Sequence, residues 1–309
     1  MKNLSFVFSL VLAFGLILSG CSGSNGSSEK KKNVLSVYTT VFPLQYFSER
    51  IGGKYVKVDT IYPPGSDEHT FEPSQKDMMN LADADLFIYI GLGLEGFVEK
   101  AKETLKNENV TMLAAAANLK LPKNQENADE EDGHSDVNPH VWLDPVYSKE
   151  MAASIKDAMI KKMPGKKDYF NQNYNKLAAE LDQLNQDFKQ TADNAVHKEF
   201  IVTHAAFGYW ETRYGIKQIS IAGLSTANEP SQKKLEGIVS AVEKEHLKYI
   251  LFEQNVNSKL GEIVEKETGI KALPIHNLAI LTNKNIKDKE TYITLMKKNL
   301  DTLKIALNN

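Results

Sequence analysis

Residues 166–196 read KKDYFNQNYNKLAAELDQLNQDFKQTADNAV and predict one long amphipathic helix. The apolar side chains of this stretch recur at steps of three and four, at Phe170, Tyr174, Leu177, Leu181, Leu184 and Phe188. About thirty helical residues at about 1.5 Å per residue form a rod of roughly 45 Å. Because such a rod separates two lobes better than it fits inside one, we expect a lobe before it and a lobe after it.

Short β-rich runs alternate with helical runs on both sides of this stretch. The β-rich runs cover residues 34–40, 55–62, 85–91 and 110–114 before it, and 199–203, 217–222, 248–252 and 270–275 after it. Helical runs fall between and after them, the last at 289–307. Alternating strands and helices predict an α/β fold in which helices cover both faces of a parallel sheet. The predicted parts are an N-terminal lobe at 34–145, connecting helices at 146–197 and a C-terminal lobe at 198–309.

The first twenty residues differ in composition from the rest of the chain. Lys2 gives a positive start, an apolar run covers residues 4–18, and the order Leu18-Ser19-Gly20-Cys21 follows. The run is too short to span a membrane comfortably and ends in small residues, so residues 1–20 are predicted to be an export signal. The order Leu-Ser-Gly-Cys resembles a bacterial lipobox, which implies cleavage before Cys21 and a lipid on that residue. The alternative is an accidental cysteine after an ordinary signal peptide.

Residues 21–33 are predicted to be a flexible tether, because Cys21 is followed by the Gly- and Ser-rich stretch SGSNGSSEKKKN. A coil of about a dozen such residues spans roughly 17–21 Å. Lipid on Cys21 would therefore hold the mature protein on the extracytoplasmic face of the cell membrane, anchored but not embedded. Cys21 is also the only cysteine, so we expect no internal disulfide framework.

The composition is that of a soluble globular protein, with 42% hydrophobic and 25% charged residues in a chain of 309. The net charge of −3 with neutral histidines does not favour nucleic acid as a partner. Acidic residues crowd the stretch 121–138, which also contains His134, and this stretch is predicted to be a mobile acidic loop. It either captures cations or is simply a solvated loop.

Several of the seven histidines fall where a parallel sheet gathers ligands. His69 follows the second predicted strand, His204 follows the run 199–203, and His276 closes the run 270–275. Glu253 closes the run 248–252 in the same way. Ligands of parallel α/β sheets bind outside the carboxyl ends of the strands, so these side chains are expected at binding edges.

His140 comes from the connection between the two halves, in the segment NPHVWLDP at 138–145. The two prolines of this segment disfavour a helical conformation at the residues before them, so the imidazole is presented from a stiff, non-helical stretch. Neutral imidazole is a good ligand for Zn(II), Cu(II) and Ni(II), and the mature chain offers no second thiolate. Each histidine taken singly is more often structural, but together they predict a shared metal site.

Four spaced segments resemble those of the zinc-binding subunits of bacterial ABC importers, a class of lipoproteins that includes manganese binders. The segments are GSDEHTFEPS (65–74), NPHVWLDP (138–145), THAAFGYW (203–210) and NEPS (228–231). The resemblance implies two (β/α)4 lobes with parallel sheets joined by a single long rigid helix, with the metal site in the interlobe cleft. It also implies that His69, His140 and His204 are metal ligands. Manganese-binding relatives typically have glutamate in place of His204, and imidazole favours zinc over the harder Mn(II).

The sequence departs from the family pattern in two places. Ala279 stands where relatives commonly carry an acidic fourth ligand, so the fourth position falls to His276, Glu68 or water. Zinc-binding relatives also often have a longer, histidine-crowded loop before the second ligand, whereas only His134 is present here. This difference weakens a metal-collecting role for the loop.

The function that the sequence supports best is a Zn(II) receptor, monomeric and not an enzyme, which delivers zinc to the membrane permease of an ABC importer. A manganese receptor is the nearest alternative. A secreted zinc hydrolase is another, with Glu68 or Glu253 as a base, although the chain has no His-Glu-x-x-His motif. An adhesin with a purely structural metal is the third.

Overall fold

The computed structural model describes residues 34–122, 137–225, 231–254 and 258–308. The predicted export signal, Cys21, the tether and His134 lie outside these ranges, as do most of the acidic stretch and the first three residues of the NEPS segment. Residues 34–309 form one compact unit. Within the described ranges, none of the helices combines the length and the apolar character that crossing a membrane requires.

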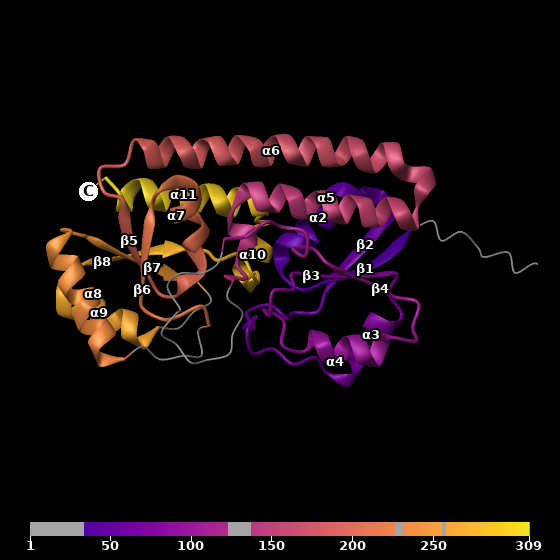
Figure 1. Cartoon of the computed structure of the whole chain (residues 1–309), viewed down its shortest axis with the longest axis horizontal. Coiled ribbons are helices and arrows are strands. Elements are labelled where there is room, and N and C mark those ends of the chain that lie inside the picture. The colour runs from indigo at the N-terminus through magenta and orange to yellow at the C-terminus, as the bar shows by residue number, and fades with distance from the viewer. Residues whose placement is uncertain (1–33, 123–136, 226–230, 255–257, 309) are drawn as a thin grey trace, which may run out of the picture. The chain divides into compact units, whose positions relative to one another are not determined.

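Two four-stranded parallel sheets organise the chain (Figure 1). The first contains β1 (Leu35–Thr39), β2 (Val56–Thr60), β3 (Leu86–Tyr89) and β4 (Thr111–Ala114) in the order β2-β1-β3-β4. The second contains β5 (Glu199–Val202), β6 (Lys217–Ser220), β7 (Tyr249–Glu253) and β8 (Lys271–Ile275) in the order β6-β5-β7-β8. Both sheets therefore place their first strand between the second and the third, and the predicted α/β class with two parallel sheets is confirmed.

The helices alternate with these strands as the sequence predicts. In the first half they are α2 (Phe42–Gly52), α3 (Gln75–Ala82) and α4 (Val98–Leu105). The connection contains α5 (Pro145–Lys162) and α6 (Lys167–Asp193). In the second half they are α7 (Gly208–Tyr214), α8 (Gln232–Lys244), α9 (Lys259–Thr268), α10 (Asn283–Lys287) and α11 (Tyr292–Ala306). The short helix α10 is absent from the sequence prediction, because its five residues carry no apolar periodicity.

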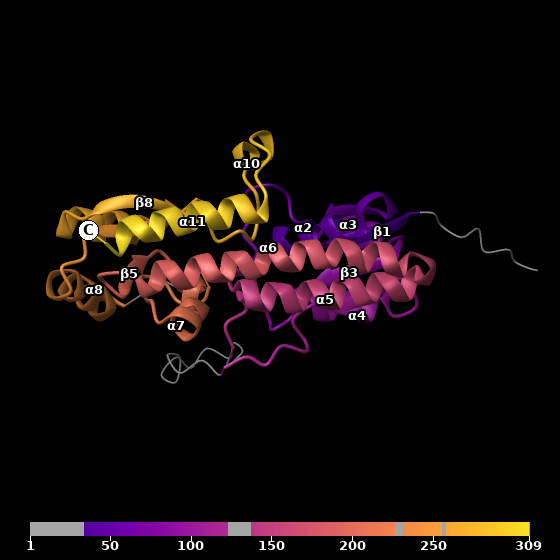
Figure 2. The same ribbon diagram turned by 90° about the horizontal axis from the view of Figure 1, so that it is seen from above.

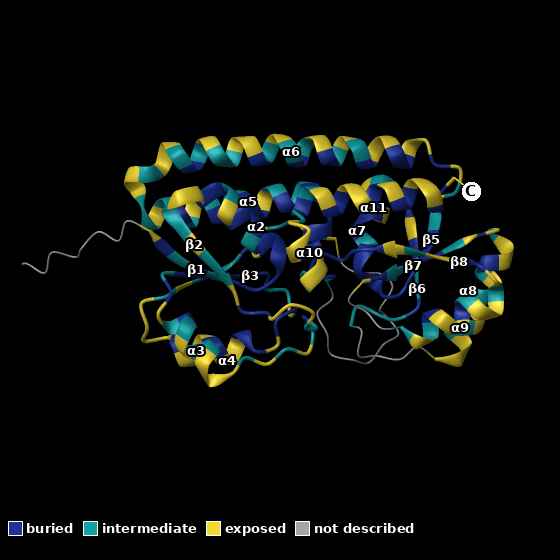
Figure 3. Ribbon diagram, turned by 180° about the vertical axis from the view of Figure 1, so that it is seen from behind, coloured by how far each residue is buried: buried dark blue, intermediate teal, exposed yellow. Residues whose placement is uncertain are grey.

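The long helix α6 is the predicted rod, and it packs along α5 and α11 (Figure 2). Its apolar residues, Phe170, Leu177, Leu181, Leu184 and Phe188, are buried, while the opposite face is exposed (Figure 3). Arg50 of α2 donates two hydrogen bonds to Glu180, at 2.8 and 2.6 Å. Five residues further along α6, Asn185 accepts the hydroxyl of Tyr214 of α7 at 3.0 Å. The helix is thus fixed to both halves, as expected for a rigid connection.

Helix α11 is a second connection between the halves. Its first residue, Tyr292, is fully buried, and its ring centroid lies 5.1 Å from that of Phe47 in α2. The Tyr292 hydroxyl donates to the carbonyl oxygen of Trp142 at 2.8 Å. The start of α11 is therefore anchored against the first half, directly behind the segment that carries His140.

Gly52 ends α2 at a point where a side chain has no space. A Cβ at this position would overlap the side chain of Val56 at the start of β2. We expect Gly52→Ala to lower the free energy of unfolding by about 1–3 kcal/mol, because overpacking forces the backbone apart. Gly237→Ala in α8 is the control, since nothing lies within 4 Å of a Cβ added there. This substitution should raise the free energy of unfolding by about 0.5–1 kcal/mol. Denaturant unfolding of both variants measures the two values, and equal shifts would contradict the overlap with Val56 as the cause.

Candidate metal centre

Three histidines from separate segments meet at one point. His69 lies in the loop after β2, His140 precedes a 3-10 turn at Val141–Leu143, and His204 follows β5 directly. One ring nitrogen from each lies within 4.8 Å of the others. Ring centroids are 5.2 Å apart for His69 and His140, 5.0 Å for His140 and His204, and 6.0 Å for His69 and His204. The structure thus brings these three predicted residues together.

Local hydrogen bonds shape the loop that presents His69. The carboxylate of Asp67 accepts the backbone N–H of His69 at 2.8 Å, a bond from residue i+2 that makes a tight turn. The hydroxyl of Tyr62 donates to the carbonyl oxygen of Glu68 at 3.3 Å, and the Tyr62 ring packs edge-on against Phe71 with centroids 5.1 Å apart. These contacts hold the loop against the end of the first sheet.

The segment that carries His140 is held by α7 of the second half. The Tyr209 hydroxyl donates to the carbonyl oxygen of Asn138 at 2.5 Å, and the indole N–H of Trp210 donates to that of Leu143 at 2.8 Å. Arg213 forms an ion pair with Asp144 at 2.7 Å. His140 is therefore mounted on the same rigid part of the molecule as His204.

Neighbouring side chains determine which ring nitrogens of His140 and His204 carry lone pairs. Nδ1 of His140 lies 2.8 Å from Oδ1 of Asn138, an oxygen that also accepts the backbone N–H of His140, so this Nδ1 donates. Nδ1 of His204 lies 2.6 Å from Oε1 of Glu253 and donates to it. In the neutral rings both Nε2 atoms therefore carry lone pairs, and they face each other at 3.3 Å.

This pair of nitrogens has the spacing that a bound zinc ion requires. Two lone pairs at 3.3 Å repel each other unless a proton or a metal ion lies between them. Tetrahedral zinc with Zn–N distances of about 2.0–2.1 Å holds two nitrogen ligands roughly 3.4 Å apart. The described donors therefore fit a divalent cation with a preference for imidazole.

Burial and charge affect the two rings differently. Burial lowers the pKa of His140 well below its usual value, and the nearby His204 and His69 lower it further. Burial also acts to lower the pKa of His204, but the charge and the hydrogen bond of Glu253, with smaller effects of Glu68 and Asp67, outweigh burial and raise it. The neutral form of His140 is thus favoured, whereas Glu253 favours the protonated form of His204.

Two buried carboxylates border the histidines. Glu68 has an oxygen 4.0 Å from Nε2 of His69, and burial raises its pKa to about 7 against the opposing effects of its backbone hydrogen bond and of His204. The amide of Asn277 donates to the same oxygen at 3.4 Å. Glu253 contacts Nδ1 of His204, on the side of the ring away from His140. These groups place negative charge around a point where a cation would sit.

His276, the fourth histidine that the sequence suggested, uses both ring nitrogens elsewhere. Its Nδ1 accepts the backbone N–H of Leu278 at 2.8 Å, and its Nε2 lies 3.2 Å from Oδ1 of Asn285. That oxygen also accepts the N–H and the hydroxyl of Thr282, so Nε2 of His276 must donate. The ring thus has no lone pair left for a metal, and it is not part of the group formed by the other three.

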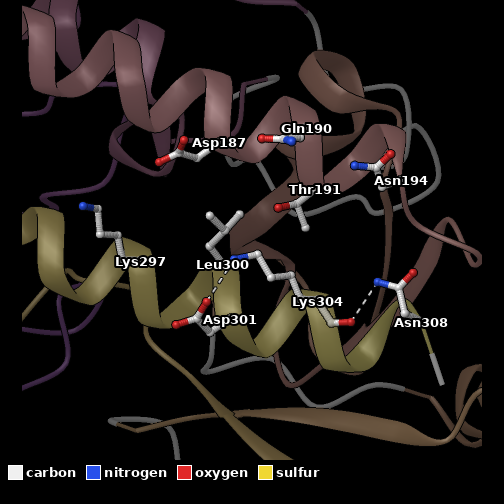
Figure 4. A pocket seen from close by; sticks show the side chains of 9 residues that line it. All are labelled: Asp187, Gln190, Thr191, Asn194, Lys297, Leu300, Asp301, Lys304 and Asn308. Atoms are coloured by element: carbon white, nitrogen blue, oxygen red, sulfur yellow. Dashed lines mark hydrogen bonds and ion pairs between the residues drawn. The ribbon is translucent and has the colours of Figure 1, made fainter.

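A surface cavity of about 570 Å³ lies between α6 and α11, away from the histidines (Figure 4). Its lining is mostly polar and charged, with Lys297, Lys304, Asp187 and Asp301 among the residues. In the histidine group, by contrast, His140 and His204 are buried and His69 is partly buried, so the candidate metal centre is not an open surface pocket.

Sequence reasoning did not assign a role to Asn138, Asn277 or the contact between Glu253 and His204. Asn138 belongs to the segment NPHVWLDP, and the position of Glu253 at a strand end was visible in the sequence. Nothing in the sequence marked Asn277 as a functional residue, apart from its position directly after His276. Its backbone carbonyl accepts the indole N–H of Trp142 at 2.6 Å, a contact that spans the two halves of the chain.

Two parallel sheets with a largely buried group of imidazoles near their strand ends are typical of a two-lobed binding protein. The chain belongs to the family described as zinc-uptake complex component A, periplasmic, whose model matches residues 37–306. The resemblance seen in the sequence motifs is therefore confirmed. The family is one of solute-binding receptors and not of enzymes.

Relatives and solved structures agree with this membership. The chain is 34% identical over 287 residues to the zinc-binding protein AdcA of Streptococcus pyogenes serotype M6, covering 88% of this chain and 56% of that protein. It is 33% identical over 314 residues to the high-affinity zinc uptake system protein ZnuA of Bacillus subtilis, covering 99% and 98%. The Zn(II)-bound ZnuA-like domain of Streptococcus pneumoniae AdcA is similar at a TM-score of 0.76 and 32% identity, covering 89% and 100%. The chain thus spans a little over half the length of AdcA.

Proposed function

We propose that this chain is an extracytoplasmic receptor that binds Zn(II) through His69, His140 and His204 and delivers it to the permease of an ABC importer. The observation that carries the proposal is the pair of buried Nε2 lone pairs of His140 and His204, 3.3 Å apart, with His69 beside them. The family, and the zinc in the names of its relatives, support the same cargo.

Glu68 is our choice for the fourth ligand. Its buried carboxylate lies 4.0 Å from Nε2 of His69, so a small movement of the side chain would bring an oxygen to the ion. His276 is the weaker candidate, because both its ring nitrogens are in hydrogen bonds, and water remains the third option. A carboxylate would also offset part of the charge of the buried cation.

The proposal extends to the location of the protein. Lipid on Cys21 would anchor the chain to the outer face of the cell membrane, and residues 22–33 would hold the receptor clear of the surface. We propose a monomer that docks on the permease when loaded. The lipid, the docking partner and the oligomeric state rest on the sequence and on the family, and the name zinc-binding lipoprotein given to AdcA of Streptococcus pneumoniae supports the anchor.

The metal content of the protein tests the cargo. We expect protein purified without added metal to contain one zinc per chain, and we expect zinc to displace manganese in competition, because three imidazoles favour zinc over the harder Mn(II). Elemental analysis and a competition titration measure both. Preferential loading with manganese would contradict the proposal and favour the manganese receptor.

The same preparation distinguishes a receptor from a zinc hydrolase and from an adhesin with a structural metal. Turnover of peptide or ester substrates by the zinc-loaded protein would favour a hydrolase. Loss of folded structure on chelation, followed by circular dichroism, would favour a purely structural metal. A receptor should release zinc to a chelator, stay folded and show no turnover.

A further inference from the structure

Each half of the chain contains a buried glutamate that accepts the hydroxyl of a threonine: Glu95 lies in the loop after β3, and Glu253 is the last residue of β7. In the first half, Oε1 of Glu95 accepts the hydroxyl of Thr40 at 2.8 Å. In the second half, Oε1 of Glu253 accepts the hydroxyl of Thr203 at 2.7 Å. Thr40 directly follows β1 and Thr203 directly follows β5, the strands that hold the same position in the two sheets. The two halves therefore build the same buried contact at the carboxyl ends of their strands.

The residue after the threonine distinguishes the two copies. It is Val41 in the first half and His204 in the second. Within the described part of the chain, Glu95 accepts the Thr40 hydroxyl and the backbone N–H groups of Ile90 (2.8 Å) and Gly91 (3.0 Å). Glu253 instead accepts the backbone N–H of His204 at 3.2 Å and its ring Nδ1–H at 2.6 Å. The second half thus connects this buried carboxylate to a side chain of the metal centre.

The contact with Glu253 fixes both the orientation and the electron density of the His204 ring. The side chains of both residues are fully buried, so water does not compete for the bond. A carboxylate bonded to one nitrogen of a metal-bound imidazole fixes the tautomer and makes the other nitrogen a stronger donor. The ring of His140 has only the neutral amide oxygen of Asn138 in this position. The two imidazoles are therefore supported unequally.

We propose that Glu253 is a positioning residue for metal binding, which orients His204 and supplies a negative charge that strengthens it as a ligand. The inference rests on the proposed function, because it assigns a role within the same zinc site. Glu253 does not itself reach the ion, since it contacts Nδ1 while Nε2 faces His140.

The variant Glu253→Gln removes the charge and preserves the shape. Three donors point at Oε1, from Thr203 and from the backbone and ring of His204, so the amide oxygen should occupy that place and keep the ring oriented. We expect the Kd for Zn(II), measured by competition with a chelator, to rise about 10- to 100-fold. The visible absorption spectrum of the Co(II)-loaded protein should shift as well, because the ligand field of His204 changes.

Glu95→Gln is the matched control, because it neutralises a glutamate with the same threonine contact but no histidine. Its Kd for Zn(II) and its Co(II) spectrum should stay at the wild-type values. Wild-type affinity and spectrum in Glu253→Gln would overturn the proposal, and so would equal losses of affinity in both variants. Glu253→Asp is the second variant, for use if Glu253→Gln does not fold. Its shorter side chain withdraws the carboxylate from His204, so zinc binding should weaken. Wild-type affinity in Glu253→Asp would overturn the proposal. Failure of the wild-type protein to bind zinc would instead reject the proposed function.

Discussion

Replacement of His140 by alanine is expected to raise the Kd for Zn(II) on the order of 10²- to 10³-fold. Structural zinc sites bind with apparent free energies of about 10–16 kcal/mol, so each of three or four ligands contributes roughly 3–4 kcal/mol. His140 is fully buried and its Nδ1 bonds to Asn138, so alanine at this position would remove one of the proposed ligands from a site that is closed to water on this side. Competition with a chelator of known affinity measures the change.

His276→Ala is the matched control for His140→Ala. His276 is also a buried histidine at the end of a strand, but its ring nitrogens bind Leu278 and Asn285. We expect its removal to lower the free energy of unfolding and to leave the Kd for Zn(II) within about tenfold of wild type. If His276→Ala lost as much affinity as His140→Ala, the fourth ligand would be His276, and our choice of Glu68 would be rejected.

The sequence was sufficient to predict the fold, because each element carries its own periodic signal. All eight predicted strands are present with ends shifted by at most two residues, and the apolar steps of Phe170 to Phe188 form the buried face of α6. The role of α11 was not predictable in the same way. Its amphipathic pattern predicts a helix, but the burial of Tyr292 against Phe47 and Trp142 depends on contacts made by distant segments.

The candidate site was predicted in part, and the missing part depends on local backbone geometry. The rule that ligands gather at strand ends, together with the motifs, singled out His69, His140 and His204. The same rule selected His276, yet the backbone turns back there because Leu278 adopts a positive φ of 63°, a conformation that no sequence rule assigns to leucine. The backbone N–H of Leu278 then donates to the lone pair on Nδ1 of His276.

The choice of Glu253 as the partner of His204 likewise depends on which strands are neighbours. β5 and β7 pair directly, so Thr203 and His204, just past the end of one, lie next to Glu253 at the end of the other. The sequence places several acidic residues near strand ends and does not distinguish among them. Strand order, which the periodic pattern leaves open, decides which carboxylate meets the histidine.

Affinity for Zn(II) is expected to fall as the pH drops, beginning above the pH at which an ordinary histidine takes up its proton. Zinc binds only the neutral ring, and the pKa of His204 is raised above its usual value by Glu253, despite burial. A proton therefore competes with the ion at His204 as soon as the pH falls below this raised pKa. Each pH unit below it should raise the Kd at least about tenfold, because binding displaces the proton of His204 and, below pH about 7, also that of the proposed ligand Glu68.

His140 should not add to this dependence until the pH is much lower, because burial and the neighbouring histidines hold its pKa well below the usual value. The Kd is therefore expected to rise first through protonation of His204 and Glu68, and to rise more steeply only at the lower pH at which His140 is protonated. Chelator competition between pH about 8 and pH about 5, corrected for the protonation of the chelator, measures this profile. A Kd that stays constant over this range would mean that no imidazole is deprotonated on binding, and a ligand set of buried histidines would then be ruled out.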